Sequence, residues 1–131
     1  MAPILWYSKR QATVETSVFG AEFVAMKNGI ETVRGLRYKL RMMGVELSGP
    51  TYVYCDNKSV VHNTQAPEST LKKKSNSICY HAVQESVAMD ESTIAHISSK
   101  ENPADICTKV LQGGEKRNHL IQKMLSDICD H

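Results

Sequence analysis

The sequence has no apolar run of the length that crosses a membrane. A bilayer-spanning helix needs about 20 consecutive apolar residues, and the apolar stretches of this chain are short and interrupted by charged residues. The segment from Met1 to Tyr7 also lacks the basic flank and the cleavage-site pattern of a secretory signal. These two absences predict an intracellular protein without a membrane partner.

Cysteine is scarce and shows no pattern of a disulfide framework. The four cysteines are irregularly spaced, with no CxxC pair, at Cys55, Cys79, Cys107 and Cys129. Cys79 stands near His81 and Cys129 near His131, but a zinc site needs four converging ligands, and two close neighbours on a helix point in different directions. Reduced thiols that mostly pack in the interior are the preferred interpretation.

A strong excess of one charge is also missing. The chain has 16 basic and 14 acidic residues, a net charge of +2, which is too small to indicate a nucleic-acid binder without a clearly basic face. With 131 residues, 41% of them apolar and 23% charged, the composition is that of a globular protein that can bury a core unaided. We expect one domain over residues 1–131.

Three segments have the periodicity of amphipathic helices. Apolar residues recur every three or four positions from Ser17 to Met43, and Gly44 supplies a C-terminal stop. A second helix is expected over residues 77–89, and a terminal amphipathic helix within residues 115–131 has one apolar face, made of Leu120, Ile121, Met124, Leu125 and Ile128. The order Asn102-Pro103 predicts the start of another helix.

Three short segments read as strands. They are Ile4 to Tyr7, Thr51 to Cys55 and Ser92 to Ser98. Residues 64–76 show no apolar periodicity and are expected to be an exposed connection. The alternation of strands and helices predicts an α/β fold in which helices flank a mixed sheet.

Three acids stand out by position in these elements. Glu22 flanks the apolar stripe of the long helix, Asp56 follows a strand, and Asp105 falls in the first turn of a helix. Acids brought together in this way suit hard divalent ions, a pair of which can catalyse phosphodiester hydrolysis. Each acid also has a structural interpretation, because Glu22 can simply flank the core, Asp56 can cap the next helix, and Asp105 can pair with Asn102.

Four motifs in order resemble the ribonuclease H domain of copia-type (Pseudoviridae) LTR retrotransposon Pol polyproteins. Residues 17–25, Ser-Val-Phe-Gly-Ala-Glu-Phe-Val-Ala, resemble its serine-rich helix that ends in Ala-Glu-Tyr. Residues 54–60, Tyr-Cys-Asp-Asn-Lys-Ser-Val, resemble its Asp-Asn-Gln-Ser strand end. Residues 80–85, Tyr-His-Ala-Val-Gln-Glu, and 102–109, Asn-Pro-Ala-Asp-Ile-Cys-Thr-Lys, are similar to its Tyr-His-Phe-Ile-Arg-Glu and Ala-Asp-x-x-Thr-Lys segments. The four motifs cover nearly the whole chain.

The resemblance implies a ribonuclease H-like fold and a metal-dependent endonuclease that degrades the RNA strand of RNA–DNA hybrids. Glu22, Asp56 and Asp105 match three of the family's four metal-binding carboxylates, and the complete family site takes two ions, Mg²⁺ or Mn²⁺. The expected partners are the hybrid itself and the reverse transcriptase portion of the same polyprotein, in a cytoplasmic virus-like particle or the nucleus. The Tyr80-His81 motif is expected to be structural.

The sequence departs from the family pattern at its N-terminus. Family members begin with an aspartate-bearing strand and a hairpin that lead into the strand matched by Ile4 to Tyr7, and Met1 stands where the hairpin is expected. A truncated domain that lacks one carboxylate predicts little or no activity for the isolated chain. The alternatives are a catalytically inactive remnant or binding module, and a structural domain that presents the apolar face around Leu120 to a partner.

Basic and polar residues offer candidate substrate contacts. The run Lys72, Lys73 and Lys74 either neutralises phosphates or merely solubilises a connection, and Asn57 is a further candidate nucleic-acid contact. The arginines Arg34, Arg37 and Arg41 are interpreted as a solvated surface. His96 is a candidate for assisting product release by resemblance, but its place in a predicted strand favours packing.

Overall fold

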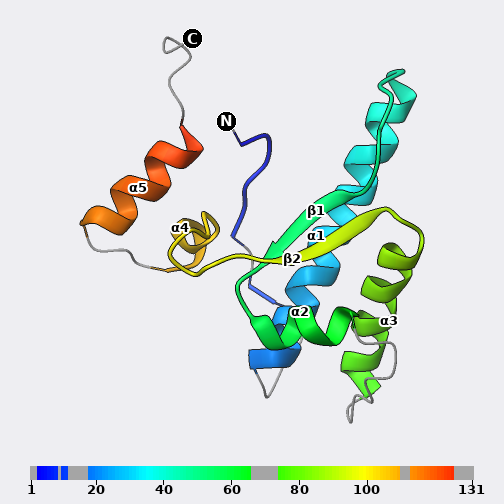
Figure 1. The fold of residues 1–131 in the computed structure, drawn as a ribbon, viewed down its shortest axis with the longest axis horizontal. Coiled ribbons are helices and arrows are strands. Elements are labelled where there is room, and N and C mark those ends of the chain that lie inside the picture. Colours follow the sequence, from blue (N-terminus) through cyan, green and yellow to red (C-terminus); the bar gives the residue numbers. More distant parts are fainter. Residues whose placement is uncertain (1–2, 9, 12–17, 66–73, 110–112, 126–131) are drawn as a thin grey trace. The chain divides into compact units, whose positions relative to one another are not determined.

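The computed structural model describes residues 3–8, 10–11, 18–65, 74–109 and 113–125 (Figure 1). The chain separates into two compact units. We call Val14–His96 the sheet unit, and Met1–Thr13 together with Ile97–His131 the terminal unit. Each unit is described by itself.

Helix α1, Val18–Met42, is the longest element of the sheet unit and confirms the predicted long helix. It ends as expected at Gly44, whose φ of 79° suits a residue without a side chain. The Gly44 amide donates to the Arg41 carbonyl at 3.0 Å and the Val45 amide donates to the Leu40 carbonyl at 2.9 Å, a Schellman end. None of the described helices is both long and apolar enough to span a membrane.

The sheet consists of two parallel strands in the described part of the chain. Strand β1, Thr51–Cys55, pairs with β2, Ser92–His96, and the register places Val53 beside Ile94. Between them the chain forms α2, Lys58–Gln65, and α3, Lys74–Ala88. An α/β architecture is therefore confirmed. The antiparallel pairing that a mixed sheet needs is not seen among these residues.

Several predicted boundaries were wrong by a turn or less. The exposed connection is shorter than residues 64–76, because α2 continues to Gln65 and α3 already begins at Lys74. Thr64 is buried, and its hydroxyl donates to the Val61 carbonyl at 2.7 Å. A polar residue that satisfies its own backbone can thus stay helical where sequence reasoning expects a loop.

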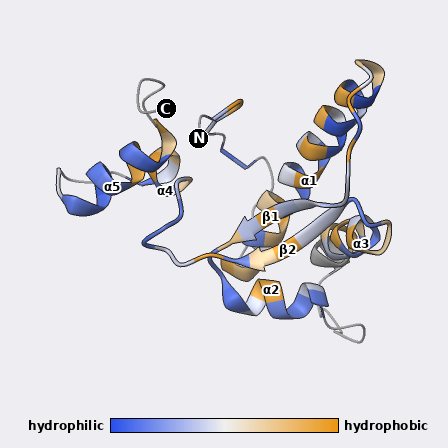
Figure 2. Cartoon of the chain, turned by 45° about the horizontal axis from the view of Figure 1, so that its top comes forward, coloured by the Kyte–Doolittle hydropathy of each residue, from blue (hydrophilic) through white to orange (hydrophobic). Residues whose placement is uncertain are grey.

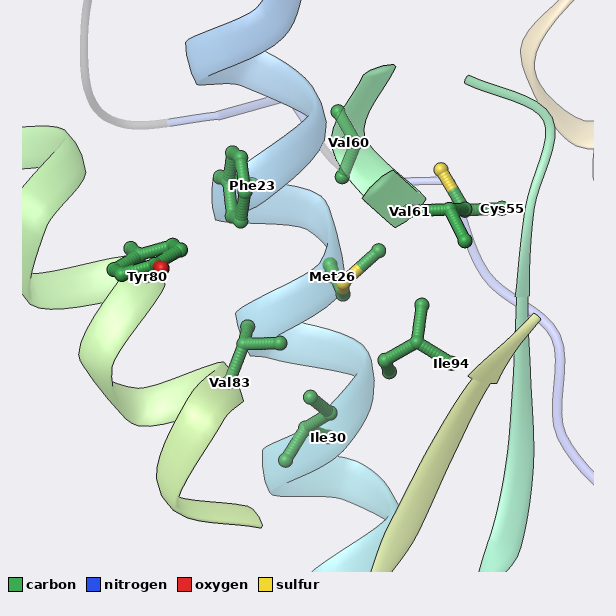
Figure 3. Packing of buried hydrophobic residues seen from close by; sticks show 9 residues of the cluster. All are labelled: Phe23, Met26, Ile30, Cys55, Val60, Val61, Tyr80, Val83 and Ile94. Atoms are coloured by element: carbon green, nitrogen blue, oxygen red, sulfur yellow. The ribbon is translucent and has the colours of Figure 1, made fainter. Parts of the chain in front are cut away.

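The core of the sheet unit lies on both sides of α1 (Figure 3). Phe23, Met26 and Ile30 of α1 are buried. They pack with Tyr80 and Val83 of α3 and with a group from β1, α2 and β2, namely Cys55, Val60, Val61 and Ile94. Burial of one such side chain contributes roughly 1.5–3 kcal/mol. Figure 2 shows the hydrophobic and hydrophilic patches that alternate along α1, as an amphipathic helix requires.

The terminal unit contains two short helices. Helix α4, Asp105–Thr108, begins three residues after Asn102, later than predicted, because the Asn102 side chain accepts the Ala104 amide at 3.1 Å and forms a turn first. Helix α5, Glu115–Met124, starts where the terminal helix was expected. Its Leu120 is fully buried and Leu125 is exposed. Ile128 lies outside the described residues.

The segment Ile4 to Tyr7 was wrongly predicted as a strand. It has no regular secondary structure, and its four side chains are each more than half exposed. A β-strand needs a neighbour that takes up its backbone hydrogen bonds, and no such pairing of this segment occurs within the described ranges. Apolar composition alone therefore did not determine its conformation.

Candidate metal centre

Two of the three predicted acids meet in the sheet unit. Glu22 lies in the second turn of α1, one residue before the buried Phe23, and Asp56 directly follows β1. Ligand atoms of Glu22, Asp56 and Cys55 all lie within 4.8 Å of one another. Both carboxylates are partly buried, and the cysteine is buried. Residues 33 and 34 positions from Glu22 in the sequence thus form one cluster of possible metal ligands with it.

Local structure explains why these groups converge. Phe23 and Met26 pack in the core, and this packing places the N-terminal part of α1 beside the end of β1. The neighbouring Glu22 therefore faces the end of that strand. At that end Asn57 caps α2, since its side-chain oxygen accepts the amides of Ser59 at 3.1 Å and Val60 at 3.4 Å. The turn between strand and cap holds Asp56 in place beside Glu22.

The Cys55 thiol is held in a negative environment. Burial raises the pKa of this thiol, and the charges of Glu22 and Asp56 raise it further, although the hydrogen bond with the Asn57 backbone opposes the change. The Asn57 amide donates to the Cys55 sulfur at 3.4 Å. The raised pKa favours the protonated thiol.

Asp105 belongs to the terminal unit and already binds two cationic side chains. It is only 3% exposed, and its two oxygens bind Lys109 Nζ at 2.9 Å and Lys116 Nζ at 2.8 Å. Burial alone would raise the pKa of Asp105, but the hydrogen bonds and charges of Lys116 and Lys109 outweigh it and lower that pKa. The Asp105 carboxylate therefore pairs with lysines, and its contact with Asn102 is a backbone hydrogen bond from the Asp105 amide to the Asn102 carbonyl at 3.3 Å. Its participation in a shared site stays a prediction.

The other residues singled out from the sequence are His96, Tyr80 and the lysine run, and each lies in a different setting. His96 ends β2, in register with Cys55, and is exposed, so the packing role favoured from the sequence was wrong. Its proposed role in product release stays a prediction. The structural role expected for the Tyr80-His81 motif is confirmed for Tyr80, which is buried and meets the Phe23 ring edge to face at 5.9 Å between centroids, whereas His81 is exposed. Lys72 and Lys73 lie outside the described residues, and Lys74 begins α3.

The arginine stripe is not simply a solvated surface. Arg34 binds Glu91 at 2.6 Å, and Arg37 donates to the Thr51 hydroxyl at 2.8 Å and the Gly49 carbonyl at 3.1 Å. These contacts join α1 to the chain around the start of both strands.

The zinc alternative gains no support here, because the cluster of possible ligands found among the described residues does not include Cys79 or His81. Cys129 and His131 lie outside those residues.

Sequence reasoning missed two features of these sites. Cys55 was interpreted as a packing group, although its position directly before Asp56 was a signal. In a strand, neighbouring side chains point to opposite faces of the sheet. Asp56 lies past the end of β1, so this alternation does not separate its side chain from that of Cys55. Lys116 was missed because it lies 11 residues from Asp105 in the sequence, and only the folded structure shows the two side chains in contact.

Fold and site together define a small α/β protein in which two carboxylates and a thiol converge at the end of a strand. The chain is 29% identical over 109 residues to the retrovirus-related Pol polyproteins from transposons RE2 and RE1 of Arabidopsis thaliana. It is 31% identical over 108 residues to that from transposon TNT 1-94 of Nicotiana tabacum. These matches cover 82–83% of the chain but only 7–8% of each relative.

Over most of its length, the chain is thus homologous to a short segment of transposon Pol polyproteins. No protein-family model matches it, and no solved structure matches it.

Proposed function

We propose that this chain is the ribonuclease H region of a retrotransposon Pol polyprotein and that its site hydrolyses the RNA strand of RNA–DNA hybrids. The observation that carries the proposal is the convergence of Glu22 from α1 with Asp56 from the end of β1. The sequence predicts both acids as site residues independently of their proximity. The similarity to Pol polyproteins supports the same assignment, because reverse transcription produces the hybrid substrate.

The residues at this cluster fit a divalent cation. Mg²⁺ and Mn²⁺ prefer oxygen ligands, and Glu22 and Asp56 would hold such an ion between carboxylates that already lie close together. When bound, metal ions of this kind activate the attacking water and stabilise the leaving oxygen. Glu22 and Asp56 contribute negative charge and a position fixed by the packing of α1. The expected third acid, Asp105, must exchange its two lysine partners to take part.

Recognition of a hybrid would depend on shape and backbone contacts. A nuclease that clears many sequences reads groove width, phosphate spacing and ribose hydroxyls. The side-chain oxygen of Asn57 is occupied in the cap of α2, so a phosphate contact would come from its amide nitrogen, which is the hydrogen-bond donor. The run Lys72 to Lys74 would add cationic contacts, and the reverse transcriptase portion of the polyprotein is the proposed protein partner.

One observation favours a second function, a non-catalytic binding remnant. Both oxygens of Asp105 are bound by lysines, and an acid neutralised in this way gives no ligand to a metal ion. A chain with only Glu22 and Asp56 available would hold an ion weakly and position the nucleophile poorly. Such a chain would still bind nucleic acid or the parent polyprotein but would not hydrolyse a substrate.

Hybrid cleavage and metal binding together test the proposed function. The purified chain is incubated with a labelled RNA–DNA hybrid and Mn²⁺ or Mg²⁺, and Mn²⁺ binding is measured by calorimetry. We expect slow cleavage at most, and Mn²⁺ binding that Glu22→Gln and Asp56→Asn each weaken. Either variant should lower any cleavage rate by about a hundredfold, since misplacing a reacting group by an ångström costs that much.

A matched control is Glu31→Gln, which removes a carboxylate from the surface of the same helix, where Glu31 pairs with Lys27 at 3.0 Å. Its cleavage and Mn²⁺ binding should equal those of the unchanged chain. Absence of both cleavage and Mn²⁺ binding would reject the nuclease in favour of the binding remnant. Cleavage that persists in Asp56→Asn would show that this cluster is not the active site.

A further inference from the structure

The terminal unit holds one buried carboxylate between two lysines, and the charges of the three groups do not cancel. Asp105 is 3% exposed, and its oxygens bind Lys109 Nζ at 2.9 Å and Lys116 Nζ at 2.8 Å. One carboxylate therefore meets two ammonium groups, which leaves one unit of positive charge. The side chains of Lys109 and Lys116 are 56% and 39% exposed. The acid is shielded from solvent, and the surface presents the cations.

Arg117 adds a third cation at the start of α5. It follows Lys116 in the first turn of the helix and is exposed. Its guanidinium lies 3.9 Å from the point where a side chain on Gly113 would begin. The first turn of a helix favours acids, because the helix dipole is positive there. This turn has one acid, Glu115, and two cations, so the stability of α5 does not explain the cations.

A ligand of these cations has to leave the two salt bridges of Asp105 in place. An anion that drew both lysines away would leave a buried charge unpaired, which costs more free energy than a surface ion pair returns. An ammonium group has three donor hydrogens, and the contact with Asp105 uses one of those on Lys116. A second acceptor can therefore bind Lys116 while Asp105 keeps both lysines at one place.

Phosphate groups have the chemistry that such a surface recognises. A phosphodiester presents negatively charged oxygens along a regular backbone, and lysine and arginine are its usual partners. We propose that Lys109, Lys116 and Arg117, which we call the basic cluster, form a binding site for the phosphodiester backbone of nucleic acid. The inference rests on the hybrid substrate of the proposed function and adds a contact in the terminal unit. It does not require Asp105 to bind a metal ion.

Salt-dependent binding of a hybrid tests the basic cluster directly. The full chain is titrated into a fluorescein-labelled RNA–DNA hybrid in EDTA, so that neither cleavage nor a divalent ion contributes, and anisotropy is measured over a series of salt concentrations. Each phosphate contact releases counterions and steepens the dependence of log K on log salt. Lys116→Gln and Arg117→Gln should each lower that slope by about 1 and weaken binding by about two- to fivefold.

Lys123→Gln is the matched control. Lys123 lies on the same helix, its side chain is 40% exposed, and it pairs with Glu101 at 2.8 Å. The control therefore removes the same charge from a side chain of nearly the same exposure, outside the basic cluster. Its salt slope should equal that of the unchanged chain. Attraction by net charge alone predicts instead the same loss for Lys123→Gln as for Lys116→Gln.

A conservative variant and a folding check guard the result. Lys116→Arg keeps the charge and should keep the slope. Far-ultraviolet circular dichroism shows whether each variant is folded. If Lys116→Gln does not fold because Asp105 loses a partner, Arg117→Gln still decides, since Arg117 is exposed. Inorganic phosphate, exchanged for chloride at constant ionic strength, should not displace the hybrid. Displacement at millimolar phosphate would assign the cluster to the free ion and overturn the backbone site.

The outcomes separate this inference from the nuclease proposal. Equal slopes for Lys116→Gln, Lys123→Gln and the unchanged chain, or no binding of the hybrid, overturn the basic cluster as a backbone site. Mn²⁺-dependent cleavage with equal slopes leaves the nuclease standing and removes only this contact. A slope lowered by Lys116→Gln alone of these two variants, without cleavage or Mn²⁺ binding, supports the backbone site and rejects the nuclease.

Discussion

The sheet unit and the terminal unit hold their acidic residues in opposite ways. In the sheet unit, Glu22 and Asp56 face each other and Cys55, an arrangement that concentrates negative charge. In the terminal unit, Asp105 is buried between Lys109 and Lys116. The second arrangement contains the two lysines that balance its acid. The same residue type therefore serves a potential ligand site in one unit and an internal ion pair in the other.

The two units also differ in what stabilises them. The sheet unit has an apolar core drawn from three helices and both strands. In the described part of the terminal unit, Leu120 is the buried apolar side chain, and ion pairs join Asp105 and Glu101 to basic side chains. Glu101 binds His119 at 2.9 Å and Lys123 at 2.8 Å. We therefore expect pH and salt to affect the stability of the terminal unit more than that of the sheet unit.

The largest effect should come from Phe23→Ala in the sheet unit. Phe23 is fully buried and meets Phe19 and Tyr80 edge to face. Its removal should lower the free energy of unfolding by about 3–5 kcal/mol, because the cavity cannot collapse fully. Urea unfolding followed by circular dichroism measures the loss. A loss below about 1 kcal/mol would show that the core does not hold the sheet unit together.

Leu120→Ala should have a smaller effect in the terminal unit. Leu120 is fully buried, but its neighbours Ile121 and Met124 are half-buried and can relax into the space. We expect a loss of about 2–3 kcal/mol, in the lower part of the range for such changes. Hydrogen exchange of the α5 amides reports it. A loss equal to that of Phe23→Ala would remove the contrast between the two units.

Asp105→Asn tests the buried ion pairs and their pH dependence. Lys109 and Lys116 have side chains that are 56% and 39% exposed, so they can return to water, and the cost should be about 1–2 kcal/mol. Because the folded-state pKa of Asp105 is lowered, this stability is present above the ordinary Asp pKa of about 3.9 and is lost as pH falls through the lower folded value.

The measurement is protection of the α4 and α5 amides from pH 7 down to 2, compared between the unchanged chain and the variant. The unchanged chain should lose protection in the acidic part of this range, and Asp105→Asn should show a smaller loss. If both chains respond to acid identically, Asp105 does not provide the pH dependence, and Glu101, whose pKa its partners Lys123 and His119 also lower, becomes the candidate.

The smallest effect is expected for Lys27→Gln, the matching ion-pair change in the sheet unit. Lys27 binds Glu31 at 3.0 Å on the surface of α1. Exposed pairs of this kind contribute about 0.5 kcal/mol or less. Urea unfolding should therefore scarcely distinguish this variant from the unchanged chain. A loss as large as that of Asp105→Asn would mean that burial does not separate the two kinds of ion pair.

Much of the secondary structure of the sheet unit could be predicted because its causes are local. The apolar periodicity and Gly44 determined α1, and the β-rich composition determined β1 within its observed bounds. Boundaries failed where a side chain satisfied its own backbone, as at Thr64 and Asn102. The strand predicted at Ile4 to Tyr7 failed because pairing requires a neighbour, and composition does not supply one.

From the sequence alone, the order of motifs singles out Glu22, Asp56 and Asp105 as the predicted site residues. Which side chains surround these acids follows only from the folded structure. It placed Cys55 against the first two acids and two lysines against the third. The physical reason is that a motif specifies residue types along the chain, whereas electrostatics and ligand choice depend on distances of a few ångströms that arise when helices pack on strands.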